Sequence, residues 1–246
     1  MVRMLKDFWA SRKLIWKLAR NDFKTRYAGS YFGVLWAMVQ PVIIVLVYWF
    51  VFQIGLNNAT AELKQGISVP FVLWLVSGIV PWFYFSESLS NGTNALLEYN
   101  YLVKKVVFKV EILPVIKLIS CLFVHAFFVA IMFIVFLVSG KRPQISWIQI
   151  IYYSFAASMY ALALTYLTSA IQVFFKDMAQ IVSICLQFGM WLTPIMYDEA
   201  IFTSRASWLE WVFKLNPFYY IAAGYRDSML TGSWFFERPT MTIYFW

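Results

Sequence analysis

Five long stretches of this sequence contain no Asp, Glu, Lys or Arg, and this feature restricts the fold more than any other. A membrane-crossing helix needs about 20 mostly apolar residues to span a hydrocarbon core of about 30 Å. All five stretches reach that length, since they cover residues 27–61, 65–86, 118–140, 143–175 and 178–197. The sequence therefore excludes a soluble enzyme. It predicts an all-α, polytopic membrane protein with spans near 31–56, 67–88, 113–139, 147–175 and 179–197.

Charge agrees with this class and predicts an orientation. Only 13% of the residues are charged, against roughly 25% in soluble domains. With five spans, 13 Lys and Arg residues lie on the side of the amino terminus and seven on the other side. Basic residues in short loops stay in the cytoplasm, so we expect a multi-pass protein of the cell membrane with a cytoplasmic amino terminus. The net charge of +8 then requires no nucleic-acid partner.

Residues 5–28 have the pattern of an amphipathic helix in the membrane surface. Aromatic and aliphatic side chains share one face of a helical projection, and a row of bases lies on the neighbouring face. One interpretation is an anchoring helix with positive-inside charges. The other gives four bases a role in recruiting an anionic, lipid-linked substrate: Lys17, Arg20, Lys24 and Arg26.

The inner segment 97–109 is too polar to span a membrane and too apolar for a free loop. It is either an interfacial connector or a short docking helix that presents Tyr99, Tyr101 and Leu102 to a cytoplasmic partner. Charged neighbours in the same segment are Glu98, Lys104 and Lys105.

Ionisable groups inside the spans are few. Glu87 lies at the inner part of the second span and has either a structural or a transport role. The single histidine, His125, follows Cys121 by four residues, and without a third ligand we expect packing and no metal site. The chain has no P-loop and no zinc or nucleophile-elbow motif. A nucleotide that drives transport would therefore bind another polypeptide.

Aromatic residues make up 21% of the chain, and aromatic rings stack on the apolar faces of sugars. Because Trp82, Phe83, Tyr84 and Phe85 are consecutive, at least one of them faces the protein interior. In residues 198–238, Trp-rich runs too short to cross a membrane favour a pair of re-entrant or interfacial helices over an ordinary loop.

Read in order, several segments resemble the membrane subunit of ABC-2-type polysaccharide exporters, which include O-antigen, capsule and teichoic-acid transporters. The resemblance covers nearly the whole chain. It rests on Asp22-Phe-Lys-Thr-Arg-Tyr27, Gly78-Ile-Val-Pro-Trp82, Leu102-Val-Lys-Lys105, Phe174-Phe-Lys-Asp177, Trp191-Leu-Thr-Pro194, Leu215-Asn-Pro217 and Tyr225-Arg226. Within the family, the segments Val47-Tyr-Trp-Phe-Val-Phe52 and Gly232-Ser-Trp-Phe-Phe236 resemble the wall-teichoic-acid exporter permeases.

The resemblance implies an architecture. A single transmembrane domain over residues 1–246 would form a homodimeric channel above two separate ATPase subunits, which would bind ATP and Mg. The segment 97–109 would be the coupling helix, and residues 198–230 would be the re-entrant helices of the outer gate. A sixth span would begin after Pro239.

The resemblance also implies a substrate and site residues. The substrate would be a polymer linked to undecaprenyl diphosphate, most simply teichoic acid, with O-antigen or capsular polysaccharide as the alternative. A membrane-embedded lipid-sugar transferase and an ion-coupled transporter are rival classes. The expected channel aromatics are Trp36, Trp82, Phe83, Tyr84, Phe85, Trp191 and Tyr197, and the expected outer-gate residues are Asn216, Pro217, Tyr225 and Arg226.

Overall fold

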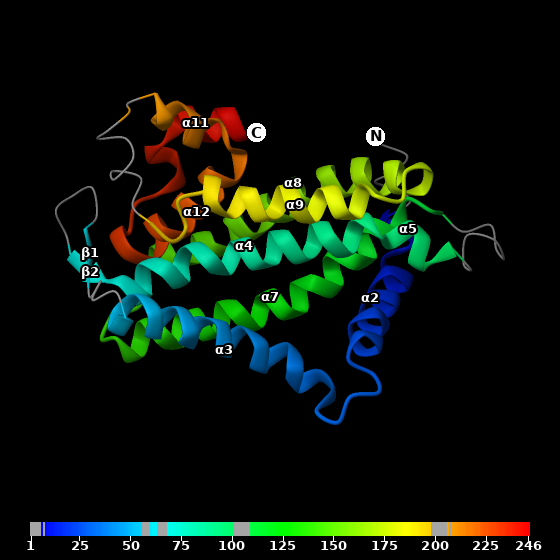
Figure 1. The fold of residues 1–246 in the computed structure, drawn as a ribbon, viewed down its shortest axis with the longest axis horizontal. Coiled ribbons are helices and arrows are strands. Elements are labelled where there is room, and N and C mark those ends of the chain that lie inside the picture. The colour runs from blue at the N-terminus through cyan, green and yellow to red at the C-terminus, as the bar shows by residue number, and fades with distance from the viewer. Residues whose placement is uncertain are drawn as a thin grey trace. The chain divides into compact units, whose positions relative to one another are not determined.

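A computed structural model describes residues 6, 8–55, 60–62, 68–100, 109–197, 206 and 208–246, and these are almost entirely helical (Figure 1). They form two compact units: residues 1–39, 84–126 and 158–186 make up unit 1, and residues 40–83, 127–157 and 187–246 make up unit 2. The α-helices are α2 (Arg12–Arg26), α3 (Trp36–Trp49), α4 (Phe71–Thr93), α5 (Ala95–Glu98), α7 (Ile112–Val138), α8 (Gln149–Phe174), α9 (Met178–Leu192), α11 (Leu209–Leu215), α12 (Pro217–Arg226) and α13 (Pro239–Phe245). The shorter elements are η1 (Gly33–Leu35), η2 (Phe50–Gly55), β1 (Thr60–Glu62), β2 (Ser68–Pro70), η3 (Ile145–Ile148), η4 (Asp227–Thr231) and η5 (Phe235–Glu237).

Three of the five predicted spans are helices long and apolar enough to cross a membrane, among the residues that the structure describes. They are Phe71–Thr93, Ile112–Val138 and Ile145–Phe174. On α7 the large side chains of Ile134, Leu137 and Val138 are exposed, as contact with lipid requires. The all-α, polytopic class predicted from the charge-free stretches is confirmed.

The other two predicted spans are shorter apolar helices. In place of a span over 31–56, the chain forms η1, α3 and the π-helical turn η2. In place of a span over 179–197, α9 ends at Leu192 and turns follow through Tyr197. Pro194 has no N–H to continue the helical ladder and disfavours a helical conformation at the preceding residue, which explains this end.

The start and end of the second span also differ from the prediction of 67–88. Residues Ser68–Pro70 pair as a strand with Thr60–Glu62 in a short antiparallel ladder, so α4 begins only at Phe71. It continues to Thr93 because its last polar side chains find partners inside the protein. Thr93 Oγ1 lies 2.7 Å from the Leu89 carbonyl oxygen and 2.8 Å from Thr168 Oγ1 on α8.

In unit 1, the contacts fix the relative directions of α4, α7 and α8. Tyr84 Oη lies 2.7 Å from Ser158 Oγ, and together with the Thr93–Thr168 pair this means that α4 and α8 run parallel. Against α7 the order reverses, since Tyr84 stacks on His125 with ring centroids 4.5 Å apart and Asn91, further along α4, donates to the Cys121 sulfur. Three successive spans would run in these alternating directions.

Unit 2 carries the short helices of the carboxyl-terminal part. Asn216 caps α12, since its side-chain oxygen accepts a hydrogen bond from the Phe218 N–H at 3.0 Å, and Pro217 takes the first helical position. The π-helical turn η4 ends at Gly232, whose φ of 78° suits glycine. Within the predicted 198–230, the described residues include α11 and α12, and their role as re-entrant helices stays a prediction.

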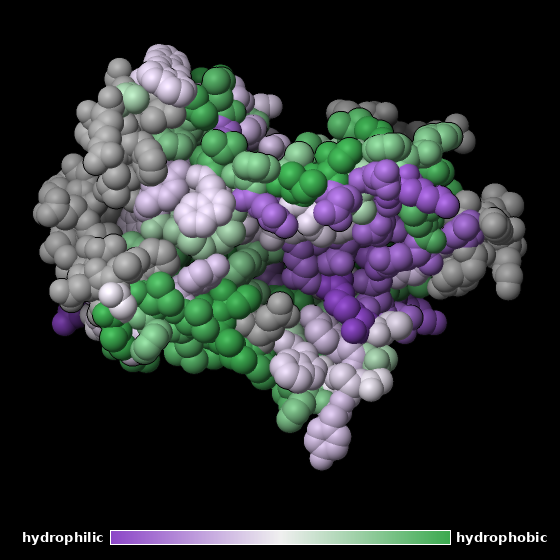
Figure 2. Space-filling model, viewed as in Figure 1, coloured by the Kyte–Doolittle hydropathy of each residue, from purple (hydrophilic) through white to green (hydrophobic). Residues whose placement is uncertain are grey.

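Figure 2 shows hydrophilic side chains gathered around α5 and the first half of α9, both in unit 1. Hydrophobic side chains cover the surface over the second half of α3, in unit 2. The ionic contacts described next lie within unit 1.

Candidate functional site

The apolar face of α2 carries an acidic residue into the protein. Ile15 and Ala19 are buried in one cluster with Ile112, Leu113 and Ile116. Asp22 follows Ile15 by seven residues and Ala19 by three, so it lies on the same helical face. Its side chain is only 8% exposed. The packing of α2 therefore requires partners for a buried carboxylate.

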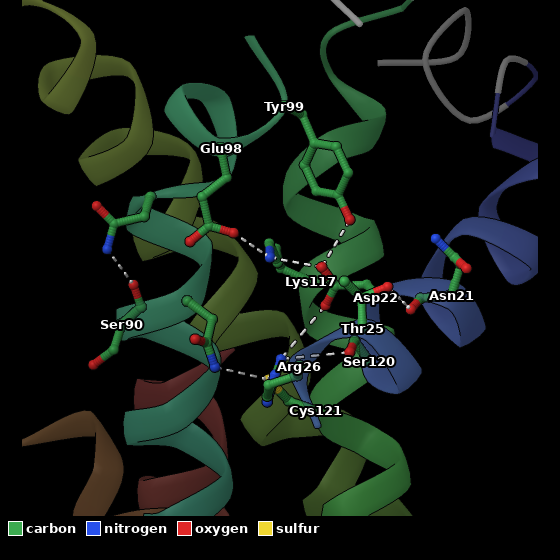
Figure 3. A network of polar contacts seen from close by, with 12 residues as sticks. Asn21, Asp22, Thr25, Arg26, Ser90, Glu98, Tyr99, Lys117, Ser120 and Cys121 are labelled. Atoms are coloured by element: carbon green, nitrogen blue, oxygen red, sulfur yellow. Dashed lines mark hydrogen bonds and ion pairs between the residues drawn. The ribbon is translucent and has the colours of Figure 1, made fainter. Parts of the chain in front are cut away.

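Lys117 of α7 is the first partner. Its Nζ lies 2.7 Å from Asp22 Oδ1 and 2.5 Å from Glu98 Oε2 at the end of α5 (Figure 3). The hydroxyl of Tyr99 donates to the same Asp22 oxygen at 2.7 Å, and Lys117 Nζ lies 5.2 Å from the centroid of the Tyr99 ring. One lysine thus joins α2, α7 and the end of α5.

Arg26 forms the other half of the network. Its guanidinium pairs with Glu87 of α4 and lies 3.5 Å from Asp22 Oδ2, one helical turn back. The same group donates to Ser120 Oγ at 3.4 Å, and it lies 3.7 Å from the sulfur of Cys121. We call Asp22, Arg26, Glu87, Glu98 and Lys117 the ionic cluster; it joins four helices through three carboxylates and two cations.

The electrostatics of Asp22 follow from these contacts. Burial opposes ionisation and raises its pKa, but the hydrogen bonds from Lys117 and Tyr99 and the charge of Lys117 outweigh burial. The pKa of Asp22 therefore lies below its usual value, and the group is ionised at neutral pH. An ionised pair of this kind holds helices together and offers no proton for chemistry.

The predicted headgroup-binding bases separate into two sets. Lys17, Arg20 and Lys24 are exposed on α2, as the headgroup interpretation requires, and that interpretation stays a prediction. Arg26 differs, because its guanidinium is held in the ionic cluster and its side chain is 22% exposed. The apolar face of α2 carries it inward together with Asp22.

The predicted docking residues are also divided. Glu98 and Tyr99 contact Lys117 and Asp22, so they are tied to the protein's own helices, although the Glu98 side chain remains 50% exposed. Tyr101, Leu102, Lys104 and Lys105 lie outside the described residues. The docking role of the segment stays a prediction.

The predicted channel aromatics have mixed surroundings. Trp82, Tyr84 and Phe85 are buried between helices. Trp82 packs edge-on against Phe218 in unit 2, and Phe85 stacks on Tyr160 in unit 1. Partly buried Phe83 contacts Phe128. Only two of the seven are largely exposed in this chain, Trp36 at 44% and Trp191 at 64%. Tyr197 donates a hydrogen bond to the Trp191 carbonyl.

The predicted outer-gate residues come together in unit 2. Asn216 Nδ2 donates to Thr193 Oγ1 at 2.7 Å, and Tyr225 Oη lies 2.6 Å from Ser154 Oγ. Arg226 donates to the carbonyl oxygens of Pro194 and Ile195 at 2.6 and 2.7 Å. Asn216 and Arg226 therefore link α12 to the turn after α9, and Tyr225 links α12 to α8.

Asp22 and Lys117 are the cluster residues that the sequence patterns did not single out. A signal was present for Asp22, because it shares a helical face with Ile15 and Ala19. The sequence signal for Lys117 was weaker: it is a lysine in the second turn of a mostly apolar helix. Among the described residues, no three His, Cys, Asp or Glu side chains are grouped to hold a metal ion.

Together, the long apolar helices and the amphipathic helix α2 with its exposed bases define a polytopic α-helical membrane protein. The sequence matches the ABC-2 type transporter family over residues 13–230. The chain belongs to this family of membrane transport proteins. It is a transport subunit and not an enzyme.

Curated relatives are similar over most of their length. The O-antigen export system permease protein RfbA of Myxococcus xanthus is 28% identical over 229 residues, which cover 92% of this chain and 84% of that protein. Two proteins of the same name from Klebsiella pneumoniae are 25% and 24% identical. These matches cover 87% and 93% of this chain, and 79% and 84% of the relatives.

Proposed function

We propose that this chain is the membrane subunit of an ATP-driven exporter that moves a lipid-linked polysaccharide across the cell membrane. The family match over residues 13–230 carries the proposal, and the three relatives named as O-antigen export permeases support it. Because the chain has no P-loop motif, ATP and Mg would bind a separate ATPase subunit. Two copies of the chain would form the channel, and two ATPases would complete the complex.

The orientation of the proposed transporter follows from charge. An amino terminus in the cytoplasm places α2, α5 and the segment 97–109 on the side where an ATPase can dock. The alternating directions of α4, α7 and α8 are those that successive membrane crossings need. The exposed bases Lys17, Arg20 and Lys24 would then face lipid phosphates at the inner surface.

The relatives favour one class of polymer. All three export O-antigen by name, so we propose an O-antigen-like polysaccharide on undecaprenyl diphosphate as the substrate. Teichoic acid, expected from the resemblance to the wall-teichoic-acid permeases, is the second candidate. Both polymers reach an exporter on an anionic diphosphate lipid, which suits a basic interfacial helix.

The test is reconstitution with the ATPase subunit that a neighbouring reading frame should encode. We expect that ATPase to co-purify with the chain, and its hydrolysis rate to rise when the lipid-linked polymer is added. Inverted vesicles should take up O-antigen-type polymer more readily than teichoic acid. If no ATPase subunit bound, or if the chain transferred sugar between lipids without ATP, the exporter proposal would be wrong.

A further inference from the structure

Two of the contacts of Lys117 differ in how easily they can open. The side chains of Lys117 and Asp22 are 7% and 8% exposed, so separating them would leave two charges in a poorly hydrated place. Two charges separated in such a place stay poorly compensated, so the pair resists opening. Glu98 is 50% exposed, so water can replace Lys117 at its carboxylate at far lower cost. The contact with Asp22 is therefore the lasting one, and the contact with Glu98 can open.

The separable contact lies at the start of the segment proposed to dock the ATPase. Glu98 ends α5, and Tyr99 follows it directly. Tyr99 donates to the same Asp22 oxygen that Lys117 binds. Tyr99 thus contacts the Asp22 carboxylate on α2 directly, and Glu98 is connected to it through Lys117. Displacement of Glu98 and Tyr99 would therefore change the contacts of Asp22 and Lys117.

The Asp22 carboxylate is also connected to α4, through Arg26. Asp22 Oδ2 lies 3.5 Å from the Arg26 guanidinium, which pairs with Glu87. Arg26 also donates to Ser120, three residues beyond Lys117 on α7. The ionic cluster is therefore continuous from the start of segment 97–109, through α2, to the ends of two spans in unit 1.

We propose that Lys117 is a positioning residue for energy coupling, which transmits movement of Glu98 and Tyr99 to α2 through its shared contact with Glu98 and Asp22. This inference rests on the proposed function. It adds a route inside the chain by which docking of an ATPase reaches the helix at the membrane surface. In this route the Lys117–Glu98 contact opens, whereas Lys117 and Asp22 stay paired and move together.

The experiment uses the reconstituted complex with its ATPase and compares Glu98→Gln with Glu111→Gln. Both changes neutralise an exposed glutamate, but Glu111 lies at the turn before α7 and is not in the ionic cluster. Glu98→Gln leaves Lys117 paired with Asp22, and the amount of ATPase that co-purifies measures docking separately from coupling. We expect the polymer exported per ATP hydrolysed to fall about fivefold or more, the low end of typical coupling energies. Glu111→Gln should match the parent.

A second set of variants covers the buried pair. Asp22→Asn combined with Lys117→Met removes both charges and leaves neither unpaired. It should reduce coupling as Glu98→Gln does, and adding Glu98→Gln should cause no further loss. Lys117→Arg retains both contacts and should retain coupling. Parental coupling in Glu98→Gln, or an equal loss in Glu111→Gln, would overturn the inference. Failure of the parent to bind an ATPase would instead refute the proposed function.

Discussion

Replacement of Arg226 by Ala is expected to destabilise the part of unit 2 around α12. The guanidinium donates to the carbonyl oxygens of Pro194 and Ile195 at 2.6 and 2.7 Å. Its central carbon also lies 3.5 Å from the centroid of the Trp74 ring. Trp74 is on α4 and Pro194 in the turn after α9, so one side chain connects three segments.

The magnitude follows from these contacts. A hydrogen bond from a charged donor contributes about 1.5–3 kcal/mol, and a desolvated cation–π contact about 2 kcal/mol. Water can reach part of the site after truncation, so the net loss is smaller than the sum, and we expect about 3 kcal/mol. For a chain of 150–250 residues that corresponds to a fall in Tm of about 6–12 °C. Arg226→Lys should lose about half as much, since an ammonium cannot serve both carbonyls and the ring.

Gly78 provides the internal control for this prediction. A Cβ at Gly78 would lie 2.7 Å from Arg226 Nη2, so Gly78→Ala must displace the guanidinium. The assay is thermal unfolding of the purified protein in detergent, followed by tryptophan fluorescence. Gly78→Ala should lower Tm in the parent and have little effect in the Arg226→Ala background. Additive losses in the double variant would refute the close packing on which the reasoning depends.

Three further outcomes follow from unit 1. The pKa of Asp22 in the folded protein is below the unfolded value of about 3.9. Its ionised form therefore contributes fully to the free energy of unfolding above about pH 5, and this contribution is lost as the pH falls through the folded pKa. The Tm difference between the parent and Asp22→Asn should be constant near neutral pH and narrow below about pH 4; an unchanged difference there would contradict the pairing. Gly92→Leu should lower Tm, because a Cβ there would collide with the Thr165 side chain, and Thr165→Ala should recover part of the loss. Tyr84→Phe and Ser158→Ala should each cost about 0.6 kcal/mol in the membrane, and their combination in unfolding assays should cost no more than one of them.

Hydrophobicity alone predicted the class and most of the spans. The charge-free stretches located α4, α7 and α8 to within a few residues, because an uninterrupted apolar run has few alternatives to a buried or lipid-facing helix. The residues at which the helices begin and end were less predictable. The polar residues after Ser88 resemble a loop in sequence, but Thr93 and its neighbours are paired within the protein and extend the helix.

The ionic cluster was the part that local patterns could not predict. Asp22 and Lys117 are 95 residues apart in the chain, and their pairing depends on how α2 packs against α7. Sequence periodicity shows that Asp22 shares a face with apolar residues, but it does not identify the cation that compensates it. For the same reason Arg26 was grouped with the exposed bases of α2, although its side chain is turned toward Glu87.

The parallel pairing of α4 and α8 has a consequence for biosynthesis. The hydroxyls of Tyr84 and Thr93 find their partners on a helix that is translated more than 70 residues later. Until the ribosome has completed α8, these hydroxyls of α4 lack their interhelical partners, because Ser158 and Thr168 have not yet been translated. The interhelical hydroxyl pairs can therefore form only late in membrane insertion, and a chain arrested before residue 158 would be exposed to quality control with its second span incompletely packed.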